Sequence, residues 1–400
     1  MTAADLPKLP KTADRAAREK YLREHVAAIY DYLTDGRRGF VRADELCRRA
    51  AEAFPGLVPS REELEAEAPL LQRDKRGVEV EQGLFLSHVL ADPAAGEHLC
   101  HAMLLPLAGS EARLAEYEAR GELDLGGARV HREGRASVVT MNNPRFLNAE
   151  DESTLGPLET AIDLALLDSK SEICVLRGAA VTHSKHSGKR LFGAGINLTH
   201  LYHGRIRYLW FILRDMGLVN KLYRGVAYPH VSPEVDGREK PWIAALEGFA
   251  IGGHCQILLA VDHVIAAADA YMTLPARKEG IIPGAANLRM PRFVGDRIAR
   301  QAVMNDLRLD CASPEGRMIC SEIVPPGEMD SAIRDTVERL TGSGVVSAAG
   351  NRRAFRIAQE PLDTFRRYLS VYAREQAHCH FSPQLIANLE RNWNAAQRRA

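Results

Sequence analysis

The sequence predicts an α/β protein, in which a core with mainly parallel strands lies between two helical regions. Strand-like and helix-like segments alternate over residues 126–325, a pattern typical of parallel sheets whose strands are connected by helices. Apolar residues recur at helical spacing in residues 1–125 and again in residues 326–400. A chain of 400 residues is longer than a single hydrophobic core usually accommodates, so we expect about two compact units.

The N-terminal region, residues 1–125, is expected to be a helical packing domain. Gly and Pro punctuate its apolar runs, and such residues mark the ends of helices. No cofactor motif stands out in this region. The predicted helices span residues 16–33, 43–54, 61–71, 80–90 and 110–121.

The central region, residues 126–325, carries the predicted strands of the α/β core. From residue 328 the chain returns to helix, including one long, arginine-rich amphipathic helix over residues 352–376. Strands are predicted over residues 137–141, 173–176, 242–246 and 263–268, and helices over 151–167 and 252–261.

Charge and composition exclude several classes of protein. Lys+Arg and Asp+Glu both total 52, a balance that argues against a nucleic-acid-binding protein. No apolar stretch approaches the roughly 20 residues of a membrane span, and residues 1–11 lack the apolar segment of a secretory signal. The seven cysteines are odd in number and are not spaced in pairs, which indicates reduced thiols and a cytoplasmic location. His/Cys clusters at residues 98–101 and 378–380 lack partner pairs at zinc spacing, so no metal site is predicted.

Two glycine-containing turns carry the clearest functional signal. Residues 192–198 read Phe-Gly-Ala-Gly-Ile-Asn-Leu, and residues 247–256 read Glu-Gly-Phe-Ala-Ile-Gly-Gly-His-Cys-Gln. Each is expected between a strand and a helix, where glycine allows close backbone approach and a helix start presents free N–H groups. Two such turns facing each other supply two N–H donors to one oxygen, the geometry that stabilises a thioester enolate.

In this order and spacing, the turns resemble those of the crotonase (enoyl-CoA hydratase/isomerase) superfamily. The resemblance covers roughly residues 130–340. Beyond the two turns, it includes matching stretches at residues 266–270 and 280–287. It implies a crotonase-like spiral of ββα units, an acyl-CoA substrate, and a homo-oligomer such as a trimer or hexamer. It also implies that the catalytic oxyanion donors are the backbone N–H groups of Ile196 and Gly253.

Two departures from the superfamily pattern indicate unusual chemistry. Gln256 and Ala276 stand where a hydratase of this family has its two catalytic glutamates. An amide cannot act as a carboxylate base, so ordinary hydration is not expected. The chain resembles a subfamily that uses neither glutamate, with matching stretches at residues 143–151, 240–242 and 278–289.

That subfamily is a cofactor-independent dioxygenase. The resemblance implies conversion of (3,5-dihydroxyphenyl)acetyl-CoA and O2 to the aryl glyoxylate and free CoA, without metal or flavin. The product would supply the dihydroxyphenylglycine unit of glycopeptide-type antibiotics.

The same resemblance implies roles for further residues. Gln256 and Glu150 are expected to contact the reacting end of the substrate and its ring hydroxyls. Arg214 is expected in the substrate pocket, although the match slips by one residue there, and so is Gln376. His254 occupies a position that is usually small in the family, next to the oxyanion glycine, and is expected among the substrate-binding residues. The remaining turn residues expected to bind substrate are Ala194, Asn197, Ile251 and Gly252, and an apolar O2 pocket is expected from Ile251, Ile281, Ile282 and Leu288.

A basic loop directly precedes the first turn. Lysine and arginine suit the phosphates of coenzyme A, so this loop and Arg145 are expected to contact the nucleotide part of the substrate. The loop residues are His183, Lys185, His186 and Lys189.

Two other functions stay open on the sequence. One is a conventional crotonase-type thioester hydrolase or isomerase, which needs a base elsewhere, such as Glu150 or Glu279. The other is a non-catalytic, crotonase-like assembly partner, which is consistent with the loss of both glutamates.

Overall fold

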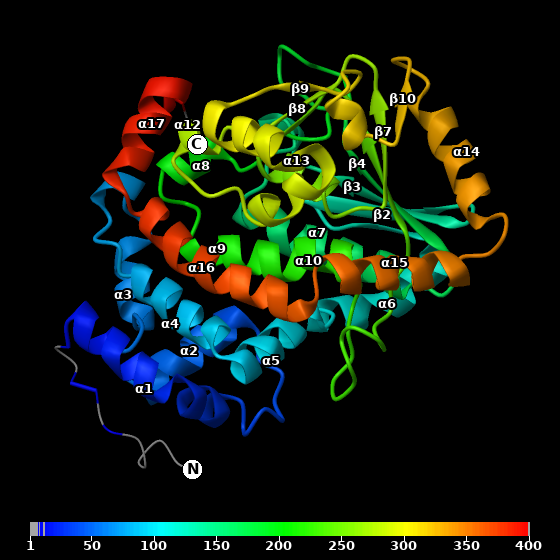
Figure 1. Cartoon of the computed structure of the whole chain (residues 1–400). Helices are drawn as coiled ribbons and strands as arrows, with labels where there is room; N and C mark the ends of the chain where they lie inside the picture. The colour runs from blue at the N-terminus through cyan, green and yellow to red at the C-terminus, as the bar shows by residue number, and fades with distance from the viewer. Residues whose placement is uncertain (1–6, 8, 11–12, 399–400) are drawn as a thin grey trace.

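The computed structural model describes residues 7, 9–10 and 13–398, so most of the stretch examined for a secretory signal, residues 1–11, lies outside the described residues. The sheets and their covering helices form one part of the molecule, and the N-terminal helices pack beneath it (Figure 1). The long helix α16 (Leu362–His380) crosses between the two parts.

The described residues of the N-terminal region form six α-helices, which confirms its helical prediction. Helix α5 was missed, because the Asp92-Pro93 pair reads as a break between helices. Asp92 instead caps α5 by accepting a hydrogen bond from the Ala95 N–H at 2.8 Å, and Pro93 occupies the first helical position, where its missing N–H costs nothing. The six helices are α1 (Arg15–Leu33), α2 (Ala43–Ala53), α3 (Arg61–Glu67), α4 (Val80–Ala91), α5 (Pro93–Leu104) and α6 (Ala108–Arg120).

The core contains a larger and a smaller sheet. In the larger sheet the strand order is β1-β2-β3-β4-β5-β7-β10, and every pair from β3 to β10 is parallel, as predicted. The smaller sheet has the order β6-β8-β9. The strands are β1 (Glu122–Asp124), β2 (Ala128–Glu133), β3 (Ala136–Met141), β4 (Ile173–Gly178), β5 (Trp242–Leu246), β6 (Phe249–Ile251), β7 (His263–Ala267), β8 (Tyr271–Thr273), β9 (Leu309–Asp310) and β10 (Glu322–Val324).

Two consecutive units show the spiral expected of a crotonase-like fold. In the first, β5 joins the larger sheet, β6 joins the smaller sheet, and helix α11 (Gly253–Leu258) follows. In the second, β7, β8 and helix α12 (Ala276–Glu279) repeat this order. Both units therefore deliver the start of a short helix to the same end of the smaller sheet, because β6 and β8 are parallel neighbours.

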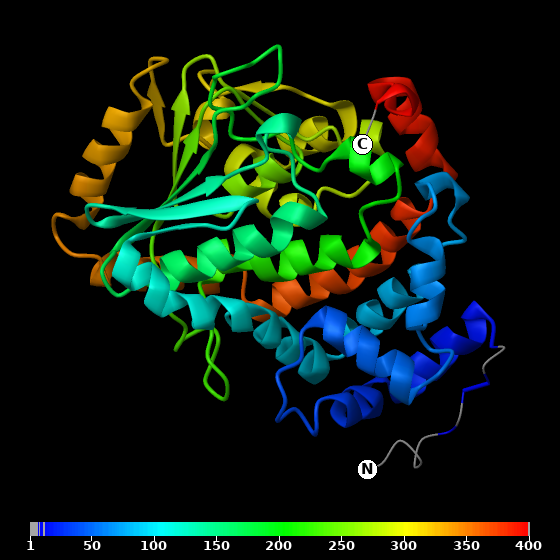
Figure 2. The same ribbon diagram turned by 180° about the vertical axis from the view of Figure 1, so that it is seen from behind.

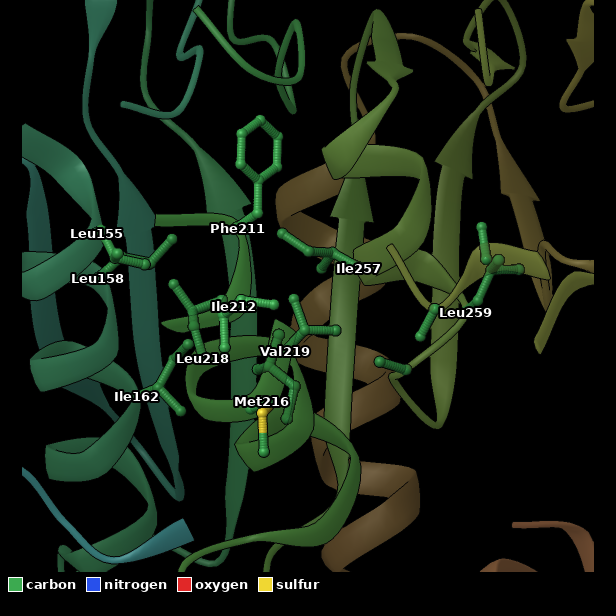
Figure 3. Close-up of a cluster of buried hydrophobic side chains, with 14 of the residues drawn as sticks. Leu155, Leu158, Ile162, Phe211, Ile212, Met216, Leu218, Val219, Ile257 and Leu259 are labelled. Atoms are coloured by element: carbon green, nitrogen blue, oxygen red, sulfur yellow. The ribbon is translucent and has the colours of Figure 1, made fainter. Parts of the chain in front are cut away.

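Helices bury the central strands on both faces, which explains why β5 is buried throughout. One layer contains α7 (Glu152–Leu167), α9 (Tyr208–Leu213), a π-helical turn (Arg214–Val219) and α10 (Asn220–Arg224). Figure 3 shows Leu155, Leu158 and Ile162 of α7 gathered with Ile212, Leu218 and Val219 in one apolar cluster, with Ile257 of α11 beside them. This packing fixes the π-helical turn, which carries Arg214, against α7.

The C-terminal region is helical, but the single long helix predicted over residues 352–376 was wrong. The chain breaks at Glu360 and Pro361, between α15 and α16, because proline cannot donate the backbone hydrogen bond that a continuing helix requires. The C-terminal helices lie around the core as seen from both sides (Figures 1 and 2). They are α14 (Met329–Thr341), α15 (Val346–Gln359), α16 and α17 (Pro383–Trp393), while α13 (Ala286–Asn305) precedes them in the central region.

None of the helices in the described part of the chain combines the length and the apolar character needed to cross a membrane.

Candidate active site

The two glycine turns lie against each other. The Gly193 N–H donates to the Phe249 carbonyl at 3.1 Å, and the Ile251 N–H donates back to the Gly193 carbonyl at 3.0 Å. Gly195 has a φ of +78°, and a Cβ atom there would lie 2.7 Å from the Ile251 carbonyl oxygen and 3.3 Å from the Gly253 nitrogen. Glycine is therefore required at 195 both for its backbone conformation and for the close approach.

Both predicted oxyanion donors are free to bind a ligand. The residues around Ile196 are paired, since the Glu150 N–H donates to Gly195 and the Asn197 N–H donates to Glu150. The N–H groups of Ile196 and Gly253 have no acceptor among the residues that the structure describes. Gly253 is the first residue of α11, where an N–H group lacks a partner within the helix. Ile196 and Gly253 line the same cavity, so the arrangement suits one oxygen held by two donors.

The cavity beside these donors has a volume of about 30 Å³. One wall is apolar and includes Phe211, Ile281 and Ile282, and the facing wall is polar. The lining residues are Ile196, Trp210, Phe211, Arg214, Asp215, Gly252, Gly253, Gln256, Leu274, Ala276, Glu279, Ile281, Ile282, Pro283, Gly284 and Tyr372.

Arg214 organises the polar wall. Its guanidinium donates to the Glu150 carboxylate at 2.8–3.0 Å, to Gln256 Oε1 at 2.9 Å and to the Gly253 carbonyl at 2.7 Å, and it pairs with Asp215 at 3.1 Å. Burial raises the pKa of the Glu150 carboxyl, but the charge and hydrogen bonds of Arg214, together with the neighbouring His254, outweigh that effect and hold the pKa below its usual value. Glu150 therefore stays ionised and fixes Arg214.

Gln256 and Ala276, the two positions at which the family resemblance implies the catalytic glutamates of a hydratase, both line the cavity. Because Arg214 donates to Gln256 Oε1, the Gln256 amide NH₂ is the group left to donate to a ligand. The Ala276 methyl supplies only apolar surface. The departures read from the sequence therefore lie at the cavity itself.

His254 lies behind the first turn and does not line the cavity. Its Nδ1 accepts a hydrogen bond from the Gly195 N–H at 2.9 Å, and its ring covers Gly193, where a Cβ atom would lie 2.2 Å from Nε2. Burial lowers the pKa of His254 to about 4, so the ring is neutral near pH 7, as an accepting nitrogen requires. The structure thus places His254 as a support of the oxyanion turn.

Other predicted binding residues lie outside the cavity. Asn197 caps helix α8 (Leu198–Tyr202), accepting from the His200 N–H at 3.2 Å and donating to Asp151 at 2.9 Å. Ala194 and Ile251 pack in a small separate cluster, and Leu288 packs against the main core. Of the four residues expected around O2, the cavity thus contains Ile281 and Ile282. Ile251 is directed away because side chains of a strand alternate between its two faces.

The basic loop contacts the smaller sheet next to the site. His186 packs edge-on against Phe249 of β6 with ring centres 5.8 Å apart, while Lys185 and Lys189 are exposed. Arg145 is exposed and lies over the Phe146 ring at 5.1 Å. The loop and Arg145 are therefore accessible to an anionic ligand.

Helix α16 supplies a wall of the site that sequence reasoning largely missed. Tyr372 lines the cavity, and Gln376, one turn later, accepts a hydrogen bond from the Ile282 N–H at 2.9 Å. Gln376 was named as a binding residue, and the structure places it as a support of the Ile281–Ile282 wall. The four-residue spacing of 372 and 376 puts both on one helix face, which is the signal that could have identified Tyr372.

The two His/Cys clusters pack among aromatic rings. Phe40 contacts the rings of His98 and His101, with centroid distances of 4.7 Å to each, and His380 packs against Phe211 and Phe381. Among the residues that the structure describes, no group of three or more His, Cys, Asp or Glu side chains is placed to hold a metal ion.

Comparisons with known proteins identify the family of the chain. The family model described as enoyl-CoA hydratase/isomerase matches residues 132–367. The chain is 44% identical over 370 residues to a (3,5-dihydroxyphenyl)acetyl-CoA 1,2-dioxygenase of Amycolatopsis orientalis, covering 91% of this chain and 83% of that protein. It is 27% identical to a short-chain-enoyl-CoA hydratase of Clostridium acetobutylicum, over 60% of this chain and 86% of that protein.

The fold is shared with solved structures. An enoyl-CoA hydratase from Mycobacterium avium subsp. paratuberculosis superposes with a TM-score of 0.55 at 20% identity, covering 69% of this chain and all of that chain. The predicted crotonase-like architecture is thereby confirmed. The chain belongs to the enoyl-CoA hydratase/isomerase, or crotonase, family.

Proposed function

We propose that the protein is a (3,5-dihydroxyphenyl)acetyl-CoA 1,2-dioxygenase. The observation that carries the proposal is a free pair of oxyanion donors, Ile196 and Gly253, in a cavity whose two hydratase positions hold Gln256 and Ala276. The likeness to the Amycolatopsis orientalis dioxygenase over most of both chains supports the same reading. The hydratases cover less of this chain at lower identity, and so support the hydrolase or isomerase alternative less.

The proposed reaction begins with loss of an α-proton from the arylacetyl thioester. The thioester oxygen takes up the negative charge of the enolate and is held by the two N–H donors, and each such donor typically contributes a few kcal/mol in a transition state. The enolate passes one electron to O2, and the two radicals combine to form a peroxide at Cα. No metal or flavin takes part in this scheme.

The peroxide then attacks the thioester carbonyl and expels the CoA thiolate. Cleavage of the O–O bond with loss of the second α-proton leaves the aryl glyoxylate. One arylacetyl-CoA and one O2 give one aryl glyoxylate and one CoA thiol, so atoms and electrons balance. The glyoxylate is the expected precursor of the dihydroxyphenylglycine unit of glycopeptide-type antibiotics.

In this proposal the polar wall of the cavity binds the aromatic substrate and the apolar wall binds O2. Arg214, Glu150 and the Gln256 amide supply the charged and polar groups that suit two ring hydroxyls. Ile281 and Ile282 supply the apolar surface that suits O2. The basic loop and Arg145 contact the CoA phosphates, and the working form is a cytoplasmic homo-oligomer.

One assay separates the three candidate functions. Metal-free protein is mixed with (3,5-dihydroxyphenyl)acetyl-CoA while O2 uptake and free thiol are followed together. We expect one O2 consumed for each thiol released. Thiol release without O2 uptake favours a hydrolase, and no change in either signal favours a non-catalytic assembly partner.

A Gln256→Glu variant tests the assigned polar wall. A carboxylate at this position places another negative charge beside Asp215 and removes the amide donor, so we expect the dioxygenation rate to fall by about tenfold or more. Full activity in this variant would show that the Gln256 amide does not take part.

A further inference from the structure

A buried carboxyl group faces the cavity without a partner. Glu279 lines the cavity and is only 4% exposed. Its side chain has no hydrogen-bond or ion-pair partner among the residues that the structure describes, in contrast to Glu150 and Asp215, which pair with Arg214. A buried carboxyl without a partner is costly to keep, so its place in the cavity wall calls for a functional explanation.

Glu279 is buried because the C-terminal helix α17 covers α12. Asn388 and Asn392 of α17 donate to the carbonyls of Arg277 and Lys278, at 3.2 and 2.9 Å. The neighbouring cations of α12 are turned away from Glu279, because Arg277 and Lys278 pair with Asp306 at 2.9 and 3.6 Å. The packing therefore leaves the Glu279 side chain only slightly exposed and keeps these two cations paired elsewhere.

The carboxyl lies close to the oxyanion turn. Glu279 Oε2 is 4.0 Å from the position that a Cβ atom would take at Gly252, and the next residue, Gly253, is one of the two donors. A thioester oxygen held by Ile196 and Gly253 has its carbonyl carbon and Cα one and two bonds away, inside the same cavity. The α-hydrogens are therefore expected in the cavity whose lining includes Glu279.

The other ionisable groups at the cavity are less suited to accept a proton. Glu150 and Asp215 are engaged by Arg214, and the charge of an adjacent guanidinium weakens a carboxylate as a base. His254 lies behind the first turn, outside the cavity. Tyr372 has a pKa well above its usual range because it is buried, so it is not a base. The charged or titratable groups around Glu279 are thus Arg277, Lys278 and Asp306 on one side, and Arg214, Asp215 and Tyr372 in the cavity lining. Glu150 does not line the cavity and is paired with Arg214.

We infer that Glu279 is the base that accepts the α-proton of the aryl-acetyl thioester. The carboxylate oxygen forms a bond to the proton as the Cα–H bond breaks, and the electron pair of that bond enters the enolate held by Ile196 and Gly253. The proton stays on Glu279 while the enolate reacts with O2. This inference rests on the proposed function, and it assigns the proton transfer to a residue three positions after the usual glutamate site at Ala276.

The environment of Glu279 also gives its carboxylate a base strength that suits proton abstraction. Burial, aided by the negative charge of Asp306, raises the pKa of Glu279 to about 8. A general base is most effective when its pKa lies near the working pH. The rate is therefore expected to rise with pH through about 8, as the carboxylate form becomes populated.

The test follows proton transfer separately from oxygenation. Wild type and variants are mixed with (3,5-dihydroxyphenyl)acetyl-CoA in D2O without O2, and deuterium entry at Cα is measured by mass spectrometry. We expect Glu279→Gln to slow exchange by about a hundredfold or more, and Glu279→Asp to restore part of the rate. Glu67→Gln, which alters an equally buried carboxyl outside the cavity, is the matched control and should exchange like wild type.

The outcomes distinguish the inference from the proposed function. Wild-type exchange rates in Glu279→Gln, or an unchanged rise of rate with pH in that variant, overturn the role of Glu279 while leaving the dioxygenase proposal intact. Exchange in wild type that depends on Glu279, without O2 uptake in air, supports the base and overturns the dioxygenase. Absence of exchange and of O2 uptake in wild type overturns both.

Discussion

At the scale of single residues, the site depends on how closely two backbone turns approach. Gly195→Ala would place a Cβ atom 2.7 Å from the Ile251 carbonyl, at a φ of +78°. The first turn must then move, and the Ile196 N–H leaves its position opposite Gly253. Loss of one oxyanion donor typically lowers the rate by about a hundredfold or more, and steady-state kinetics of the variant will show it.

Gly126→Ala is the matched control for that substitution. Gly126 has nearly the same backbone conformation, with φ +80°, but a Cβ atom there meets nothing within 4 Å. It therefore carries the same conformational cost, about 1 kcal/mol, without the clash. Equal losses of activity in the two variants would show that backbone strain, and not the approach of the turns, governs the rate.

The raised pKa of Glu279 also predicts how stability changes with pH. The pKa of Glu279 is raised in the folded protein from 4.5 to about 8, so its contribution to stability is fully present below pH 4.5 and is lost as pH rises through about 8. Glu279→Gln is free of this loss. As pH rises between these values, the free energy of unfolding of the variant should therefore increase relative to that of wild type, by no more than about 5 kcal/mol. Denaturant unfolding of both proteins at several pH values measures the difference, and parallel curves would contradict the assignment.

Sequence reasoning located the parts of the site that depend on local backbone chemistry. The two glycine turns carried the family resemblance that pointed to Ile196 and Gly253, and the N–H groups of both residues lack an acceptor among the described residues. Asp215, Tyr372 and Glu279 face the same cavity from three separate elements. Their placement depends on how helices pack, which no local pattern records. His254 shows the same limit, since its neighbour Gly253 lines the cavity while its own ring points behind the turn.

At the scale of elements, the site depends on where α16 lies. Gly83 of α4 lets α16 approach closely, because a Cβ atom there would be 2.4 Å from the Ala377 Cβ and 2.9 Å from the Ala373 carbonyl oxygen. Gly83→Ala therefore forces α16 away from α4, despite the higher helix propensity of alanine. Overpacking of this kind typically costs about 1–3 kcal/mol. Because α16 carries Tyr372, we expect lower stability together with lower activity.

Gly156→Ala provides the contrast on another helix. Gly156 lies within α7, and a Cβ atom there meets nothing within 4 Å. Alanine should stabilise this helix by about 0.5–1 kcal/mol and leave activity unchanged. Thermal unfolding and kinetics of the two variants, measured together, separate helix propensity from helix packing. A stabilised Gly83→Ala protein would contradict the close contact of α4 and α16.

The elements themselves were predicted best where apolar periodicity was uninterrupted. Helices α1 and α7 and strands β3 and β5 follow such patterns. The errors lie at prolines, since Pro93 starts a helix while Pro361 divides one, and only the surrounding chain decides which. The one-residue slip noted near Arg214 falls at the π-helical turn, which holds an extra residue per turn, and such turns often occur at functional sites.

At the scale of the whole molecule, the N-terminal helices and the α/β core share one interior. The main apolar cluster runs from Tyr21 to Ala395. An ion pair and a hydrogen bond cross the same boundary, because Arg42 from the N-terminal region pairs with Glu159 of α7 at 2.9 Å, and the Leu107 N–H donates to Asp163 of α7 at 2.8 Å. Separate unfolding of the two parts would expose both apolar and charged groups, so we expect them to unfold together.

Substitution of Lys221 tests whether the two parts unfold together, because this residue balances negative charge at their shared boundary. Its ammonium group is fully buried and pairs with Glu159 at 2.8 Å and Asp163 at 2.7 Å. Lys221→Met leaves two buried carboxylates with only Arg42 to balance them. Removing one partner of a buried ion pair typically costs about 3–5 kcal/mol. The loss should grow with pH, since burial raises the pKa of Asp163 and the variant is best tolerated when that carboxyl is protonated.

Urea unfolding followed by far-ultraviolet circular dichroism and by tryptophan fluorescence measures both the cost and the cooperativity. Lys170→Met, which alters an exposed lysine at the end of the same α7 layer, is the control and should change stability by no more than about 0.5 kcal/mol. If the two parts form one cooperative unit, both signals of Lys221→Met shift to lower urea together. A fluorescence transition that shifts while the circular dichroism of the N-terminal helices persists would show that the helices fold independently of the core.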